Sequence, residues 1–157
     1  MYRKWIIYLV LLSALLLLLS CKNESSEFNV AEQSTLQAQD WIAANQGDID
    51  AQFKIGMMFA NGEGRPKDDI QALEWFSKAA EQGNANAQYK LGLLFATGEG
   101  LPKNNLLAYA WLNVASTVME NGDARKAREK IEKEMTPEQI AEAQRLSSNW
   151  RPGQKMQ

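Results

Sequence analysis

The sequence repeats itself over two adjacent stretches of equal length. Residues 47–82 read GDIDAQFKIGMMFANGEGRPKDDIQALEWFSKAAEQ, and residues 83–118 read GNANAQYKLGLLFATGEGLPKNNLLAYAWLNVASTV. Aligned without a gap, the two stretches are identical at 15 of 36 positions. A match of this quality at a fixed period indicates a duplicated structural unit. The sequence therefore predicts a repeat protein.

Each copy predicts a hairpin of two helices. In the first copy Ala51, Ile55 and Phe59 fall on one face of a helix, and Ala72 and Trp75 begin the apolar face of a second. The turn between them contains two glycines, which can adopt the positive φ that ends a helix, and a proline, which prevents the first helix from continuing. The second copy repeats this arrangement.

Glycines and tryptophans that occur in both copies are predicted to be structural. A glycine inside a helix costs about 1 kcal/mol relative to alanine, so Gly56 and Gly92 predict places where the paired helix presses against the backbone. The two tryptophans are predicted to be buried between repeats. The structural residues are Gly56, Gly62, Gly64, Trp75, Gly92, Gly98, Gly100 and Trp111.

The pattern resembles the Sel-one-like repeat, a relative of the tetratricopeptide repeat with a similar helical hairpin. The resemblance covers residues 47–118. It implies an adaptor or assembly role with no reaction of its own. In the first copy the family's pattern is matched at Ala51, Gly56, Gly62, Gly64, Asp68, Ala72, Trp75, Ala79 and Ala80.

The flanking segments complete the predicted array. Residues 34–46 predict a partial repeat helix, residues 47–82 and 83–118 the two full repeats, and residues 119–150 C-terminal capping helices. Gly122 follows Gly83 by 39 residues, three more than the period, which predicts a longer helix ending near Met119. The fold class predicted is all-α, a short right-handed α-solenoid of helical hairpins with a partial repeat before it and a helical cap after it.

Residues 1–20 predict a lipoprotein signal peptide. Arg3 and Lys4 precede 15 residues that are apolar apart from one serine, which is fewer than the roughly 20 that a membrane-spanning helix needs. An uncleaved membrane anchor is the alternative. The segment Leu18-Leu19-Ser20-Cys21 resembles the lipobox of bacterial lipoproteins.

The lipobox resemblance implies cleavage before Cys21 and lipidation of its sulfur and new amino end. Residues 21–33 would then be a lipidated tether, and the lipid on Cys21 would hold the protein in a membrane. The resemblance implies a lipid-anchored protein of the bacterial cell envelope that faces the periplasm. Lys22 after the cysteine implies the outer membrane.

Composition excludes several classes of chemistry. The chain has no histidine and one cysteine, so it offers no histidine-based catalysis, no intramolecular disulfide and no His or Cys metal cluster. Without Arg3 and Lys4 the chain has 15 basic and 19 acidic side chains, which gives a net charge of −4. A negative net charge is not typical of a protein that binds nucleic acid. We expect no cofactor, no metal and no nucleic-acid partner.

Side chains of the first helices that packing does not require are predicted to bind a protein partner on the concave face of the array. The alternative for Phe53 and Tyr89 is packing between repeats. The candidates are Phe53, Lys54, Met57 and Asn61 in the first copy, and Tyr89, Lys90, Leu93 and Thr97 in the second.

The function predicted from these features is that of a non-catalytic periplasmic lipoprotein whose repeats act as a protein–protein interaction scaffold. We expect a monomer with one protein partner. Three alternatives remain at this point: an immunity protein against a delivered toxin, a passive structural support and a cell-wall hydrolase. No triad or motif supports the hydrolase.

Overall fold

The regular secondary structure of the described residues is helical. The computed structural model describes residues 37–120 and 122–156, and these contain no strand. Residues 37–45 are helical. Six complete helices follow: α2 (Ile49–Asn61), α3 (Asp69–Glu81), α4 (Ala85–Thr97), α5 (Asn105–Ser116), α6 (Asp123–Glu132) and α7 (Pro137–Asn149). The predicted all-α fold is confirmed. The signal peptide, the tether and Cys21 lie outside the described residues.

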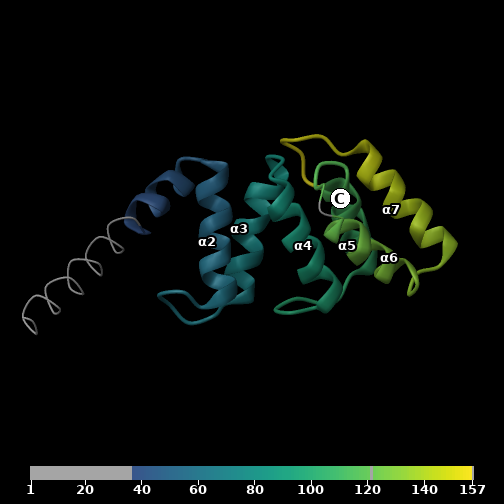
Figure 1. Cartoon of the computed structure of the whole chain (residues 1–157), viewed down its shortest axis with the longest axis horizontal. Coiled ribbons are helices and arrows are strands. Elements are labelled where there is room, and N and C mark those ends of the chain that lie inside the picture. Colours follow the sequence, from purple (N-terminus) through teal and green to yellow (C-terminus); the bar gives the residue numbers. More distant parts are fainter. Residues whose placement is uncertain (1–36, 121, 157) are drawn as a thin grey trace, which may run out of the picture. The chain divides into compact units, whose positions relative to one another are not determined.

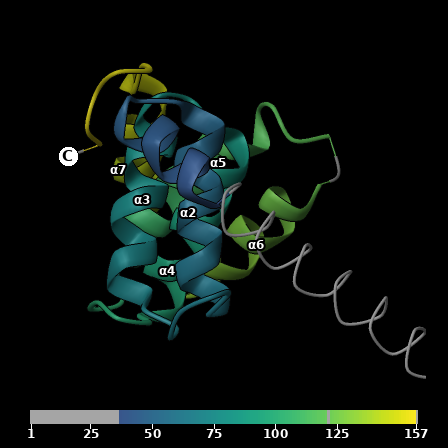
Figure 2. The same cartoon turned by 90° about the vertical axis from the view of Figure 1, so that its left-hand side faces the viewer.

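The helices pack in the order in which they occur in the chain. From Asp40 onward the chain forms one compact unit. Within it α2 packs against α3, α3 against α4, and α4 against α5 (Figure 1). Both α6 and α7 pack against α5, and α6 also touches α4. Figure 2 shows α2 and α3 side by side as one hairpin. The two copies of the sequence therefore form two consecutive helical hairpins.

Equivalent caps begin and end the helices of the two copies. Asp48 accepts a hydrogen bond from Ala51 N at 2.7 Å, and Asn84 accepts the equivalent bond from Ala87 N at 2.9 Å. At the other end, Gly62 has φ 72° and Gly98 has φ 75°. Both glycine N–H groups donate to the carbonyl four residues back, which satisfies one of the free carbonyls of the last turn.

The two glycines inside the first helices lie where the second helices come closest. An ideal Cβ placed on Gly56 would lie 2.6 Å from the ring of Phe76, and one placed on Gly92 would lie 2.6 Å from Cγ of Leu112. Phe76 and Leu112 are themselves fully buried. The absence of a Cβ therefore sets the distance between the two helices of each hairpin.

The repeat tryptophans are buried, and each is covered by an aromatic ring from a flanking segment. Trp75 is 5% exposed and Trp111 is 3% exposed. The ring of Trp41 lies 5.5 Å from that of Trp75 in an edge-to-face arrangement. The ring of Trp150 lies 5.5 Å from that of Trp111. Both flanking segments thus continue the aromatic packing of the repeats.

One helix boundary differs from its prediction. Helix α5 ends at Ser116 and has 12 residues, whereas α3 has 13, so the predicted longer helix near Met119 is wrong. The hydroxyls of Ser116 and Thr117 donate to the carbonyls of Asn113 and Val114, each at 2.7 Å. Such local bonds compete with the continuing helix. The three extra residues therefore belong to the connection before α6.

Helix α7 begins with the reciprocal capping box of Thr136 and Gln139.

The segment after α7 makes two contacts with the rest of the array. After α7 the chain turns back, and Gly153 N donates to the carbonyl of Glu81 at 2.7 Å. Met156 packs against both clusters of buried residues. The tail therefore ties the cap to the connection between α3 and α4.

Two buried glutamines occupy equivalent positions in the repeats but have different partners. Gln52 Nε2 donates to Ala44 O and Gln88 Nε2 donates to Ala80 O, both at 3.2 Å. Gln52 Oε1 also accepts from Gln82 Nε2 at 2.7 Å. Gln88 Oε1 is buried and has no partner among the described residues. The repeat position of Gln82 is occupied in the second copy by a valine, which has no donor.

Replacement of Gly56 by alanine tests the close approach of the helices. We expect Gly56→Ala to lower the free energy of unfolding by about 1 kcal/mol, because overpacking against Phe76 outweighs the gain in helix propensity. Urea unfolding of the parent and variant measures the change. Phe76→Leu serves as the paired variant, and the cost of Gly56→Ala should shrink in its background. A variant more stable than the parent would show that propensity dominates instead.

The two glutamines allow a matched comparison. We expect Gln52→Met to cost about 1 kcal/mol more unfolding free energy than Gln88→Met, because Gln52 loses two hydrogen bonds. Gln88→Met loses one bond and removes a buried oxygen without a partner. Thermal and urea unfolding of both variants give the difference. An equal or larger loss for Gln88→Met would contradict the assignment.

Candidate functional site

Two hollows lie side by side along α4. The first has a volume of about 250 Å³ and lies among α2, α3 and α4. The second has a volume of about 280 Å³ and lies among α4, α6 and the start of α5. Leu93 and Thr97 line both hollows. We call these two adjacent hollows together the α4 groove.

The floor of the α4 groove is apolar. In the first hollow Ala60 comes from α2, Phe76 from α3 and Leu93 from α4. In the second, Ala127 and Ile131 come from α6. Because α2 and α4 are the first helices of their hairpins and α6 follows them along the array, the groove is a product of the repeat. An apolar floor of this kind suits the side chains of a protein segment.

The rim of the groove carries charged side chains, and most of them are paired with one another. Lys67 Nζ lies 3.2 Å from Asp69 Oδ1 and 3.8 Å from Glu99 Oε2. The hydrogen bond and charge of Asp69, followed by the charge of Glu99, raise the pKa of Lys67 above its ordinary value. Lys67 therefore has two carboxylate partners, and the three residues together carry one net negative charge at the edge of the first hollow.

A second ion pair stands at the edge of the other hollow. Lys103 Nζ lies 2.6 Å from Glu134 Oε2, and Asn105 Nδ2 donates to the same oxygen at 3.3 Å. The hydrogen bond from Lys103, and then that from Asn105, lower the pKa of Glu134 below its ordinary value. The charge of Lys130 acts in the same direction. Glu134 therefore stays ionised between two lysines.

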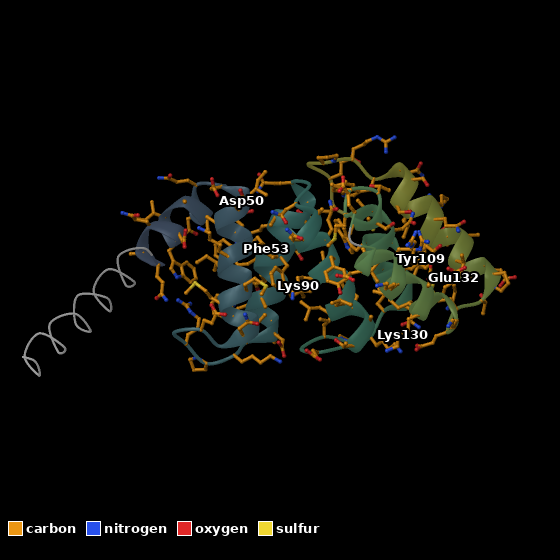
Figure 3. All side chains as sticks on the ribbon, viewed as in Figure 1. Asp50, Phe53, Lys90, Tyr109, Lys130 and Glu132 are labelled. Atoms are coloured by element: carbon orange, nitrogen blue, oxygen red, sulfur yellow. The ribbon has the colours of Figure 1, made fainter. Side chains whose placement is uncertain are left out.

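Lys90 differs from the other groove lysines in being half-buried, whereas Lys67, Lys103 and Lys130 are exposed. It lies on α4 (Figure 3) and lines the first hollow. Like Lys130, it forms no ion pair within the part of the chain that the structure describes. Its repeat equivalent, Lys54, pairs with Asp40 at 3.1 Å and has a side chain that is 61% exposed. The same lysine position therefore serves an internal ion pair in one repeat and faces the groove in the other.

The residues predicted to bind a partner separate into two groups. Lys90, Leu93 and Thr97 of the second copy line the groove. Tyr89 is half-buried and packs against the core. None of the four candidates from the first copy, Phe53, Lys54, Met57 and Asn61, lines either hollow.

The candidates from the first copy have local partners instead. The ring of Phe53 lies 5.7 Å from that of Phe76, and Met57 also packs against the core. Lys54 pairs with Asp40, as described above. Asn61 Nδ2 donates to Glu63 Oε1 at 2.7 Å. The ring contact of Phe53 therefore lies within the first repeat, and Tyr89 packs against a cluster that consists mainly of α5 residues of its own repeat.

Several groove residues were not predicted from the sequence. Lys67 and Lys103 follow the turns between helices, and Lys130 and Glu134 come from or follow α6. The sequence offered one usable signal, because Lys67 and Lys103 are identical positions of the two copies. The involvement of α6 could have been found by continuing the repeat register through the three-residue insertion.

The described residues lack two other features that would suggest a function. No cluster of three or more His, Cys, Asp or Glu side chains there has the arrangement of a metal site. No helix within those residues is both long and apolar enough to cross a membrane.

Comparison with known proteins places the repeats in a family. The model of the Sel1 repeat matches residues 49–84 and residues 85–117. These matches cover the two helical hairpins, from α2 to α5. No curated protein sequence matches the chain.

Two solved structures have a similar fold. One is the crystal structure of a protective antigen present in uropathogenic Escherichia coli strains and displaying an SLR fold, with 36% identity over 73% of this chain and a TM-score of 0.69. The other is a Sel1 repeat protein from Oxalobacter formigenes, with 35% identity over 60% of this chain and a TM-score of 0.54. This chain spans 24% and 36% of the lengths of those two proteins. Residues 49–84 and 85–117 are therefore a pair of Sel1 repeats.

Proposed function

We propose that this protein is a non-catalytic interaction scaffold, held by lipid in the bacterial cell envelope and facing the periplasm. Sel1-repeat proteins generally act in protein–protein interaction. The observation that carries the proposal for this chain is the α4 groove. It has an apolar floor and a polar rim, and three alternate helices of the array, α2, α4 and α6, contribute to it.

The surface chemistry of the groove supports binding over catalysis. A catalytic carboxylate at neutral pH is commonly a group whose pKa is raised by burial in an apolar pocket. The opposite holds for Glu134, whose pKa is lowered by Lys103. Asp69 and Glu99 each lie beside Lys67. The groove carboxylates are therefore suited to electrostatic recognition.

The lipid anchor rests on the sequence of the first 22 residues. The charged start, the short apolar stretch and Cys21 together match a lipoprotein signal. Attachment of two or three acyl chains at Cys21 would give stable membrane anchoring. Lys22 favours the outer membrane. In this arrangement the tether would hold the repeats close to the membrane and leave the groove open to a periplasmic partner.

Metabolic labelling with an alkyne fatty acid tests the anchor. We expect the parent to be labelled and to fractionate with the outer membrane, and Cys21→Ser to be unlabelled, because the acylated sulfur is lost. Lys22→Asp is the matched control. It should still be labelled but should move to the inner-membrane fraction. Labelling of Cys21→Ser, or no labelling of the parent, would contradict lipidation at this cysteine.

Site-specific photocrosslinking in living cells tests the scaffold function. A photoreactive amino acid replaces Leu93 in the groove or Glu74, an exposed residue of α3 that lines neither hollow. We expect a discrete protein adduct from position 93 and none from position 74, because the partner contacts the groove. Adducts from position 74 alone would place the interaction elsewhere. No adduct from either position would contradict a stable scaffold role.

A further inference from the structure

The two repeats present the same lysine position in two electrostatic states. Lys54 has Asp40 as its partner at 3.1 Å. Lys90 is more buried than Lys54, lines the groove and has no ion pair among the described residues. Partial burial weakens the hydration of an ammonium group, so an opposite charge that reaches Lys90 gains more than one that reaches an exposed lysine.

The groove as a whole is more positive than the chain that surrounds it. Four lysines and three carboxylates line the two hollows: Lys67, Lys90, Lys103 and Lys130, with Asp69, Glu99 and Glu134. The part of the chain after the leader is acidic overall, with a net charge of −4. The local excess of one positive charge is therefore opposite in sign to the overall charge, and it favours a negatively charged ligand.

Lysines lie beside apolar surface in both hollows. The first hollow has two lysines and two carboxylates, and the half-buried Lys90 lines it together with Ala60 and Leu93. The second has two lysines and one carboxylate, so the excess positive charge lies there, where Lys130 shares the lining with Ala127 and Ile131. Glu134 in that hollow is already bonded to Lys103. A ligand that suits both hollows carries carboxylates next to apolar side chains.

We infer that the α4 groove binds an acidic segment of a partner protein, in which a carboxylate pairs with Lys90 while neighbouring apolar side chains cover Ala60 and Leu93. This inference rests on the proposed scaffold function and adds the chemistry of the partner. The carboxylate forms a charge-assisted hydrogen bond with Lys90, which is the stronger class of hydrogen bond. Its formation also supplies the counter-charge that Asp40 supplies to Lys54.

Selection from a displayed library of random twelve-residue peptides tests the inference. The bait is the full chain in detergent micelles, as parent, Lys90→Glu, Lys90→Met and Lys54→Glu. Lys54→Glu is the matched control, because it makes the same charge change at the equivalent position outside the groove. Circular dichroism and thermal unfolding establish that each variant is folded before the selection is interpreted.

The expected results differ for each variant. Parent and Lys54→Glu select peptides enriched in Asp or Glu beside apolar residues. Lys90→Met keeps the apolar preference and loses the acidic one, and Lys90→Glu selects basic residues instead. A peptide selected by the parent should bind Lys90→Glu about tenfold more weakly or worse, the usual scale for one charge-assisted hydrogen bond.

Two results overturn the inference. One is selection of peptides without acidic enrichment, or of none at all. The other is an acidic preference that persists in Lys90→Glu. Neither result bears on the scaffold function itself, because that function is decided by crosslinking from position 93. An adduct from that position together with a failed acidic selection would show a groove that binds a partner of different chemistry.

Discussion

The close contact between the two helices of each hairpin is the constraint on which the rest of the structure depends. At Gly56 and Gly92 the partner helix occupies the space of a Cβ, so each hairpin closes around Phe76 or Leu112. The closed hairpins allow Trp75 and Trp111 to be buried, and the tryptophans in turn receive the rings of the two flanking segments. Both the stacking of the repeats and the groove along α4 follow from this spacing.

Much of the fold could be predicted from the sequence because the repeat carries the same information twice. The turn glycines, the N-caps and the mid-helix glycines each occur at matching positions in the two copies. A pattern that occurs twice at the same positions is rarely accidental. The end of α5 could not be predicted in this way, because its boundary depends on the hydroxyls of Ser116 and Thr117, whereas the first copy has Ala80 and Glu81 at those positions. A serine or threonine hydroxyl that bonds a nearby carbonyl acts locally, outside the periodic pattern.

The groove could be predicted only in part. Position within the repeat selected Lys90, Leu93 and Thr97, which line the groove, but it also selected their equivalents in α2, which do not. The two repeats have different neighbours, since the helical residues 40–45 precede α2 and supply Asp40 to Lys54. Equivalent positions share a backbone geometry, whereas the partners available to a side chain depend on place in the array. That dependence explains why the charged residues of the rim were missed.

The return of the C-terminal tail affects how the array can move. In a stack of repeats each unit contacts only its neighbours, so the array bends by small rotations at the joints between units. Here the bond from Gly153 N to Glu81 O connects the end of the chain to the joint between the first and second repeats. Rotation at that joint therefore strains the tail as well. A stiffened joint keeps the curvature of the α4 groove nearly constant, so a ligand meets a groove that is already shaped and loses less of its binding free energy to ordering the receptor.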